Sequence, residues 1–202
     1  MMWTVRNLCT LLVAPLMALT AQAVQAHPHV WVDYSIEARF DANGLVGFQQ
    51  RWILDEMFSS SIVSMFDADE DGVFSDDEME EVRKGVFDYL REYDYFTRIK
   101  IDGQDFEVRQ VTHFRAYIEG HHVVYEFFVP CVVAATSSPR TVQVLVEDME
   151  YFVEMTFKPN GLTIEGKEHV SVSSTFGSSD AFSFFGGAWR PKHLTLRFEK
   201  ST

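Results

Sequence analysis

The sequence predicts an α+β protein, in which an antiparallel, sandwich-like β-sheet domain carries an inserted helix–loop–helix. Three observations lead to this class. Apolar and polar residues alternate strictly from Val30 onward, as in a strand with one buried face. Short apolar runs are separated by turn dipeptides such as Asp102-Gly103 and Asn160-Gly161. Residues on either side of an acidic loop at 67–78 repeat every three or four positions, which is the helical period.

The first 26 residues have the organisation of a cleaved secretory signal. Arg6 provides the positive start, residues 8–21 are apolar, and Ala26 ends a small-x-small cleavage site. Pro15 and Thr20 interrupt the apolar run, which disfavours the alternative of an uncleaved membrane anchor. The mature chain is then residues 27–202, a single periplasmic domain.

The composition of the mature chain excludes some partners. It holds 16 basic residues against 30 acidic ones, so nucleic acid is an improbable partner and cations are concentrated near the surface. Cys131 is the only cysteine after processing, so no intramolecular disulfide can form. Its apolar surroundings predict a buried thiol rather than a metal or redox site.

The first two strands are expected at 30–40 and 45–53, joined by a turn at 41–44. Pro130 is expected to end a strand or to mark an edge. The segment 171–188 is rich in Ser, Gly and Phe, and it is expected to be a long, mobile loop. Further strands are expected at residues 96–101, 105–111, 114–118, 122–129, 141–146, 151–157, 162–165 and 193–199.

The loop 67–78, DADEDGVFSDDE, has the spacing of an EF-hand calcium loop. Calcium takes six to eight oxygen ligands, so the chain must wrap around the ion, and Gly72 permits the tight turn. Phe74 fills the apolar anchor position, where an aliphatic residue is commoner. The ligands at positions 1, 3, 5, 7, 9 and 12 are Asp67, Asp69, Asp71, the Val73 carbonyl, Ser75 and Glu78.

The flanks of this loop have helical spacing on both sides, so the inserted EF-hand is expected to span residues 54–93. A single loop of this kind, with no second loop to pair with, favours a structural role for Ca²⁺ over a sensor role. The competing interpretation is an acidic turn that binds no calcium.

A second metal site is predicted from the start of the mature chain, His-Pro-His. His27, His29 and Asp33 lie on one face of the first strand, with the two histidines about 6.8 Å apart along it. Their imidazoles, with the free α-amine of His27, can converge on one Zn²⁺ ion. A frayed terminus that binds nothing is the alternative. Of the adjacent pair His121 and His122, only one can join this site, because neighbouring strand residues face opposite ways.

The segments HPHVWVDYSIEARF, LVGFQQRWILDEMFS and EGHHVVYEFFVPC, together with VEDMEYFVEMTF, resemble a secreted bacterial family of unknown function. That family is often labelled a periplasmic component of an ABC-type transport system. The resemblance covers most of the mature chain, and His-Pro-His and the EGHHVVYEFFVPC block are its most specific parts.

The resemblance implies service to an inner-membrane metal permease. Some members act in zinc uptake with a nickel/cobalt-type permease, as in the Zev system. The positions that match the family motifs are His27, His29, His121 and His122. The resemblance does not fix the metal, which leaves Zn²⁺, Ni²⁺, Co²⁺ and Cu²⁺ open.

These patterns favour a periplasmic protein that captures zinc or a related metal for a permease, with calcium stabilising the fold, and not an enzyme. Two other functions stay open. One is a copper-dependent secreted enzyme that uses the amino-terminal His, although the two histidines are closer together than such a site usually requires. The other is a calcium-dependent interaction module without a transition metal.

Overall fold

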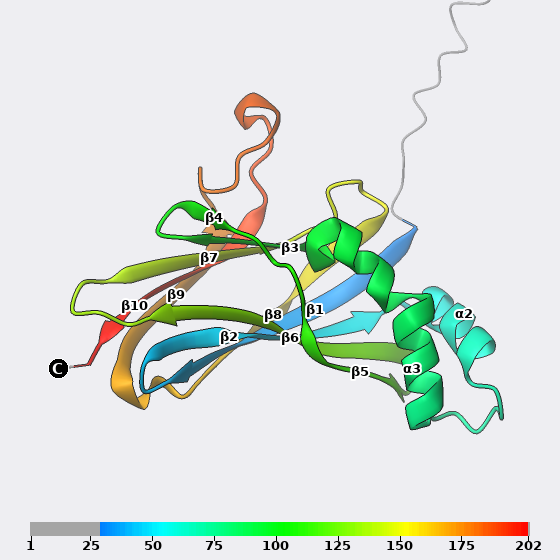
Figure 1. Cartoon of the computed structure of the whole chain (residues 1–202). Helices are drawn as coiled ribbons and strands as arrows, with labels where there is room; N and C mark the ends of the chain where they lie inside the picture. Colours follow the sequence, from blue (N-terminus) through cyan, green and yellow to red (C-terminus); the bar gives the residue numbers. More distant parts are fainter. Residues whose placement is uncertain (1–28, 202) are drawn as a thin grey trace, which may run out of the picture.

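A computed structural model describes residues 29–201. Two five-stranded sheets face each other, and helical segments close one end of the sandwich (Figure 1). The first sheet has the order β5-β6-β2-β1-β8 and the second β4-β3-β7-β10-β9. The expected combination of sheets and an inserted helix–loop–helix is therefore present.

The strands of the first sheet are β1 (Val30–Asp41), β2 (Gly44–Leu54), β5 (Thr112–Glu119), β6 (His122–Ala134) and β8 (Val153–Glu165). Those of the second sheet are β3 (Thr97–Ile101), β4 (Gln104–Phe106), β7 (Arg140–Val146), β9 (Val170–Ser178) and β10 (Lys192–Lys200). The helices are α2 (Glu56–Phe66) and α3 (Asp76–Gly85), and the 3₁₀ segments are η1 (Phe87–Phe96), η2 (Lys167–His169) and η3 (Phe185–Gly187).

The alternation in β1 and β2 builds the core as predicted. Even-numbered residues of β1 from Val30 to Phe40 are buried, and Phe48, Trp52 and Leu54 of β2 join them. Cys131 is also fully buried, and burial raises the pKa of its thiol to about 12. These side chains fill the space between the two sheets, which fixes the position of every element around it.

The expectation of a wholly antiparallel sheet is wrong at one strand pair, because β1 and β8 run parallel. The chain enters β8 from the end of the sandwich where β1 begins, and the His29 amide donates to the Phe152 carbonyl at 2.9 Å there. Apolar alternation indicates which face of a strand is buried but not the direction of the strand, so the parallel pairing could not be predicted from it.

Two expected breaks do not end strands. β6 runs through Pro130, which lies where the β2–β6 register shifts, beyond the last β5 partner at Phe128. A residue without an N–H is tolerated at such an irregularity. Asn160-Gly161 is likewise not a hairpin turn. Tyr34 pairs with Phe157 and Ile36 with Leu162, so residues 158–161 bulge out and β8 continues in the same direction.

Other expected boundaries also differ. Residues 170–178 form the edge strand β9 rather than a loop, paired along its length with β10. The strand expected at 105–111 ends at Phe106. The helix after the acidic loop ends at Gly85 instead of continuing to residue 93. A Cβ at Gly85 would lie 2.8 Å from the Phe66 ring, and the tighter segment η1 follows.

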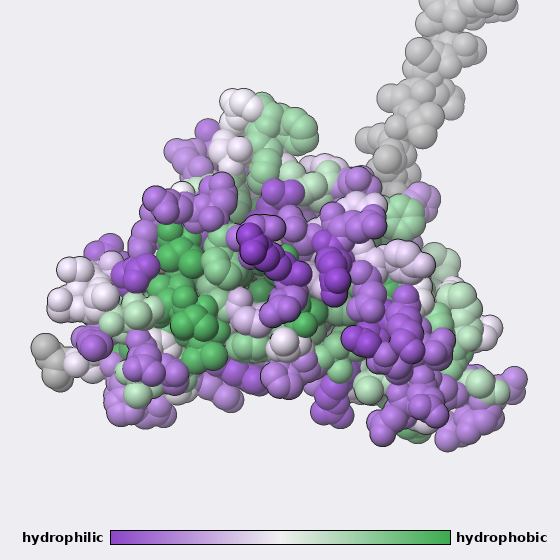
Figure 2. Space-filling model, viewed as in Figure 1, coloured by the Kyte–Doolittle hydropathy of each residue, from purple (hydrophilic) through white to green (hydrophobic). Residues whose placement is uncertain are grey.

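The surface in Figure 2 is hydrophilic over α3 and the adjoining loop, whereas apolar residues are visible between the facing sheets. Among the helices that the structure describes, none combines the length and apolarity needed to cross a membrane.

Candidate metal sites

The acidic loop connects two well-capped helices. Asp55 caps α2 by accepting from the Phe58 amide at 2.9 Å. Ser75 caps α3, and a reciprocal bond from its own amide to Glu78 completes a capping box. Each cap satisfies amides that the first turn leaves unpaired, so both helix starts are defined by local sequence. The loop is therefore held at fixed ends.

Three carboxylates converge in the first half of this loop. One oxygen from each of Asp67, Asp69 and Asp71 lies within 4.8 Å of the others. Asp67 is buried and accepts from the amides of Asp71 at 3.2 Å and Gly72 at 3.0 Å. Three like charges at this spacing repel one another, and a hard divalent cation between them removes that cost.

Gly72 provides the turn that brings these residues together. Its φ is +80°, a conformation that residues with a Cβ rarely adopt. No heavy atom lies within 4 Å of the position that a Cβ would occupy, so the requirement for glycine comes from the backbone alone.

The second half of the loop is arranged differently from the first. Glu78 accepts from the Ala68 amide at 2.7 Å and from the Ser75 amide at 2.9 Å, which ties the two ends of the loop together. Hydrogen bonds from the Ser75 and Ala68 amides and from the Ser75 hydroxyl hold the pKa of Glu78 below its usual value. Glu78 is not in the converging group, so a bidentate role requires its carboxylate to turn from these amides toward the aspartates.

Two further loop residues fix its orientation toward the protein. The Val73 side chain is exposed, and its amide donates to Asp71 at 2.8 Å. Phe74 is buried in the core cluster, as its anchor position predicts. The loop is thus attached to the hydrophobic core at its centre, while Asp69 and Asp71 are exposed.

The predicted histidine site is only partly visible, because His27 lies outside the described residues. His29 is exposed, with its ring centroid 5.1 Å from that of Phe152. Asp33 is exposed on the outer face of β1. His121 is not on a strand, since it forms the hairpin turn with Gly120; Glu119 pairs with His122. The expectation that the two adjacent histidines face opposite sides of one strand is corrected by this turn.

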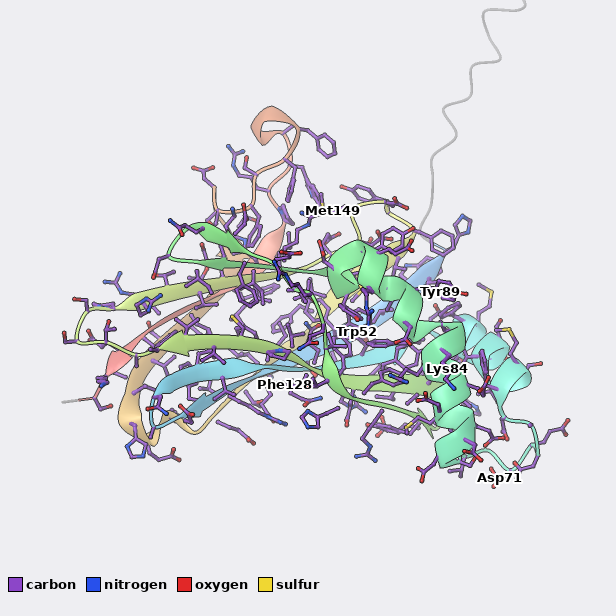
Figure 3. The ribbon with its side chains drawn as sticks, viewed as in Figure 1. Trp52, Asp71, Lys84, Tyr89, Phe128 and Met149 are labelled. Carbon is purple, nitrogen blue, oxygen red and sulfur yellow. The ribbon has the colours of Figure 1, made fainter. Side chains whose placement is uncertain are left out.

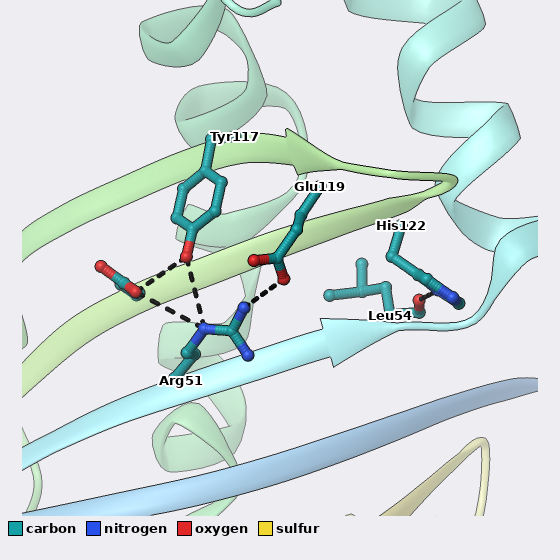
Figure 4. Close-up of polar contacts among 6 residues, drawn as sticks. Arg51, Leu54, Tyr117, Glu119 and His122 are labelled. Carbon is teal, nitrogen blue, oxygen red and sulfur yellow. Dashed lines mark hydrogen bonds and ion pairs between the residues drawn. The ribbon is translucent and has the colours of Figure 1, made fainter.

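His122 has a defined ring orientation. Its Nδ1 donates to the Leu54 carbonyl at 2.7 Å (Figure 4), which leaves Nε2 with the free lone pair that a metal requires. His29 and His122 lie toward the same end of the first sheet, but β2 separates their strands by about 10 Å. Within residues 29–201, the three aspartates are the only group of at least three ligands that converges.

Two other histidines, His193 and His113, lie within hydrogen-bond distance of neighbouring protein groups. His193 is buried, with Nε2 2.9 Å from the Ser179 hydroxyl and Nδ1 3.1 Å from the Pro191 carbonyl. His113 is exposed, with a φ of 54° and Nδ1 3.0 Å from the Thr112 hydroxyl.

A polar groove on the outer face of the first sheet was not predicted. Arg51 contacts both Tyr117 and Glu119 there (Figure 4), and Arg39, Arg115 and Lys158 line the same groove. In the sequence, the groove residues of β1 and β2 could be recognised only as outward-facing positions. The pairing of strands that are distant in the sequence brings these side chains together.

Comparison with known proteins gives a family without an assigned function. A family model described as "Protein of unknown function (DUF1007)" matches residues 12–175. An "Uncharacterized 15.5 kDa protein in trpE 3'region" of Spirochaeta aurantia is 28% identical over 140 residues, which cover 67% of this chain and 96% of that protein. An "Uncharacterized protein" of Haemophilus influenzae is 26% identical over 137 residues, covering 66% of this chain and 64% of its own length.

Proposed function

This chain belongs to the DUF1007 family of proteins of unknown function, and from that premise we propose that it is a periplasmic metal-handling protein. It captures zinc or a related divalent transition metal at its amino terminus and serves an inner-membrane metal permease. Calcium in the loop 67–78 stabilises the fold.

The observation that carries the calcium part is the convergence of Asp67, Asp69 and Asp71. Oxygen ligands alone suit Ca²⁺ rather than a transition metal that prefers nitrogen or sulfur. The loop adjoins α2 and α3, whose Ile62 and Val82 are fully buried in the core. An ion bound in the loop therefore stabilises the helix pair against the sandwich, which is a structural role.

The zinc part is supported by chemistry at one end of the first sheet. His122 already has the tautomer of a ligand, because its other ring nitrogen donates to a backbone carbonyl. His29 adds a second exposed imidazole near the start of β1. The proposed site is completed by the imidazole and α-amine of His27.

Metal counting tests both parts together. The mature protein, beginning at His27, is isolated from the periplasm and its bound metals are counted by mass spectrometry. We expect one calcium and one zinc, nickel or cobalt ion per chain. Calcium alone contradicts the transport function and favours the interaction module, whereas copper with reductant-dependent oxidation favours the enzyme.

A matched variant separates the two sites. Asp69→Asn removes one calcium carboxylate but leaves the histidines unchanged, so it should reduce calcium and retain the transition metal. His29→Ala should do the reverse. Loss of both metals in either variant contradicts two independent sites.

A further inference from the structure

A second pocket opens where η1 crosses the end of the sandwich. Its lining includes no residue of the loop 67–78, but Leu54 and Phe152 of its wall contact His122 and His29. It has a volume of about 350 Å³, within the range of small-molecule sites. Its walls come from β1, β2, β6, α2, η1 and the loop before β8, and they are largely apolar, with aromatic residues making up about half of the lining. Figure 3 labels two of its residues, Trp52 on the sheet and Tyr89 on η1.

The wall formed by Trp52 is held rigidly. Its indole N–H donates to Gln50 at 2.9 Å, and the Gln50 amide donates to the Thr97 hydroxyl at 2.9 Å. That hydroxyl in turn donates to the Tyr95 carbonyl at 2.9 Å. Phe96 lies parallel to the Trp52 ring, with centroids 6.0 Å apart. A buried hydrogen-bonded chain of this kind fixes a flat aromatic surface before any ligand arrives.

The backbone beside this surface is strained. Asp94, Tyr95 and Phe96 have φ values of 53°, 51° and 52°, which are unfavourable for residues with a side chain. Strain of this kind persists only where the surrounding structure enforces it, and it clusters at functional sites. Here it turns Phe96 into the pocket wall, with Tyr93 lining the same pocket.

One polar atom in the pocket wall has no partner. The Tyr125 hydroxyl is the only buried side-chain nitrogen or oxygen in the described part of the chain that makes no hydrogen bond. Tyr125 is 2% exposed and lines the pocket. Such groups are rare because leaving one unpaired is costly, so this hydroxyl points to a hydrogen-bonding partner that the described part of the chain does not supply.

The charged residues around the pocket disfavour anionic ligands. None of its lining residues is Lys, Arg or His, whereas Asp148 and Glu150 are both present. Asp148 is buried and accepts from the amides of Glu150, Phe152 and Val153, which holds the loop before β8 against the pocket. An anion would meet two carboxylates without a compensating cation.

We propose that this pocket binds a small, neutral aromatic molecule whose single hydroxyl or amino group pairs with the Tyr125 hydroxyl. The apolar body lies against the rings of Trp52 and Phe96, and the exposed rings of Tyr89 and Phe152 border the entrance. This binding does not require calcium, because no residue of the loop 67–78 lines the pocket.

Fluorescent probes that differ in charge test the pocket. N-phenyl-1-naphthylamine is neutral and becomes fluorescent in an apolar site, while 8-anilinonaphthalene-1-sulfonate adds a negative charge to the same framework. The mature protein should bind the neutral probe at least tenfold more tightly, with and without a calcium chelator. Equal affinity for the sulfonated probe would overturn the charge argument, and absence of binding would overturn the site.

Two variants on η1 locate the probe. Leu90→Trp places a large side chain in the pocket and should reduce probe affinity at least tenfold. Glu92→Trp adds the same side chain at an exposed position that does not line the pocket, and should leave affinity unchanged. Equal effects of the two variants overturn the location. A change in oligomeric state with Leu90→Trp, without loss of probe binding, would assign the surface to a second copy instead.

Tyr125→Phe removes only the hydroxyl and, unlike Leu90→Trp, does not fill the pocket with a larger side chain. The displacing compounds are 1-naphthol and 1-methylnaphthalene, which have similar shapes but differ in one hydroxyl. The preference for naphthol relative to methylnaphthalene should fall about two- to tenfold in the variant, the value of one hydrogen bond. An unchanged ratio would mean that the Tyr125 hydroxyl does not contact the bound compound, and this result would overturn the assignment.

Discussion

The Ser59 hydroxyl of α2 accepts a hydrogen bond at 2.8 Å from the amide of Val123 in β6, and both residues are fully buried. The same hydroxyl donates to the Leu54 carbonyl at 3.2 Å. The inserted helix is thus attached to two strands of the first sheet through one side chain. This contact links the acidic loop at the end of α2 to the sandwich.

Ser59→Ala should lower the free energy of unfolding by about 1–3 kcal/mol, because it leaves a buried amide unpaired. Urea denaturation measures this change. Ser61→Ala is the matched control, since Ser61 lies in the same helix, is exposed and only contacts the Met57 carbonyl. Its effect should stay below about 0.5 kcal/mol. Equal effects would mean that the Ser59 contact does not stabilise the fold.

Calcium at about 10⁻⁴–10⁻³ M should raise the melting temperature of the native protein. Asp69→Asn should abolish the increase without lowering the calcium-free melting temperature. Asp69 is exposed, the one hydrogen bond to its side chain, from the Asp71 amide, is long at 3.4 Å, and the change removes one of three repelling charges. Asp77→Asn, in the first turn of α3 and outside the cluster, should keep the calcium response.

Glu78→Gln is informative in a different way. It should weaken the calcium response sharply, and it should also lower stability without calcium, since Glu78 accepts from the amides of both Ala68 and Ser75. Differential scanning calorimetry measures both effects. An unreduced calcium response would remove Glu78 from the ligand set.

A glycine added before His27 tests the amino-terminal zinc site. The α-amine has a pKa of about 7.7–8.0, so it loses its proton to a metal more readily than a lysine does. Moving it away should weaken zinc binding about tenfold or more, measured by calorimetric titration, with calcium binding unchanged. His29→Ala should cost at least as much. Native affinity in the extended protein would exclude the amine as a ligand.

His122→Ala should reduce zinc stoichiometry, whereas His121→Ala should not. His122 has its Nδ1 committed to the Leu54 carbonyl, which prepares Nε2 for a metal, while His121 is exposed in the turn. Metal analysis after dialysis compares the two variants. Equal loss would show that the hairpin end rearranges on binding, and no loss would place the site elsewhere.

Glu147 should make the protein less stable as the pH rises. Burial, with the nearby charges of Glu154 and Asp148, raises its pKa from 4.5 to about 7. The folded protein therefore holds a proton on Glu147 between pH 4.5 and 7 that the unfolded chain has lost, so the contribution of Glu147 to stability is greatest below pH 4.5 and falls across this window.

Glu147→Gln removes this dependence. Relative to the native protein, its free energy of unfolding should rise from pH 4.5 to pH 8 by about 1 kcal/mol, a modest value because the carboxylate is partly solvated. Urea titrations at the two pH values measure it. A difference between the proteins that does not change with pH contradicts the raised pKa.

Local patterns predicted the parts of the fold that depend on neighbouring residues. The β1–β2 hairpin, the two helices and the Phe74 anchor follow from alternation, capping residues and loop spacing, all within a few dozen positions. β9 was missed because it is an edge strand whose Ser- and Gly-rich pattern buries few side chains. The parallel partner of β1 lies more than a hundred residues away, and no local signal identifies it.

The same distinction applies to the sites. The three aspartates of the acidic loop fall within five residues, so their spacing was enough to predict their convergence, whereas Glu78, also expected to be a ligand, does not join them. The aromatic pocket draws on β1, β2, β6 and η1, and the outer groove on β1, β2 and β5. Such surfaces exist only after distant strands pair, so they could not be predicted from the sequence.

The parallel pairing of β1 with β8 has a consequence for synthesis and folding. The β1–β2 hairpin can form as soon as its residues are available, but the other edge of β1 has no partner until residues 153–165 arrive. During that interval the free edge of this strongly alternating strand presents unpaired amides and carbonyls at every second residue, which favours pairing with other chains. Long-range pairing of this kind also slows folding. Fragments that end before Val153 should therefore aggregate, even though they contain the complete helix–loop–helix and the central strands.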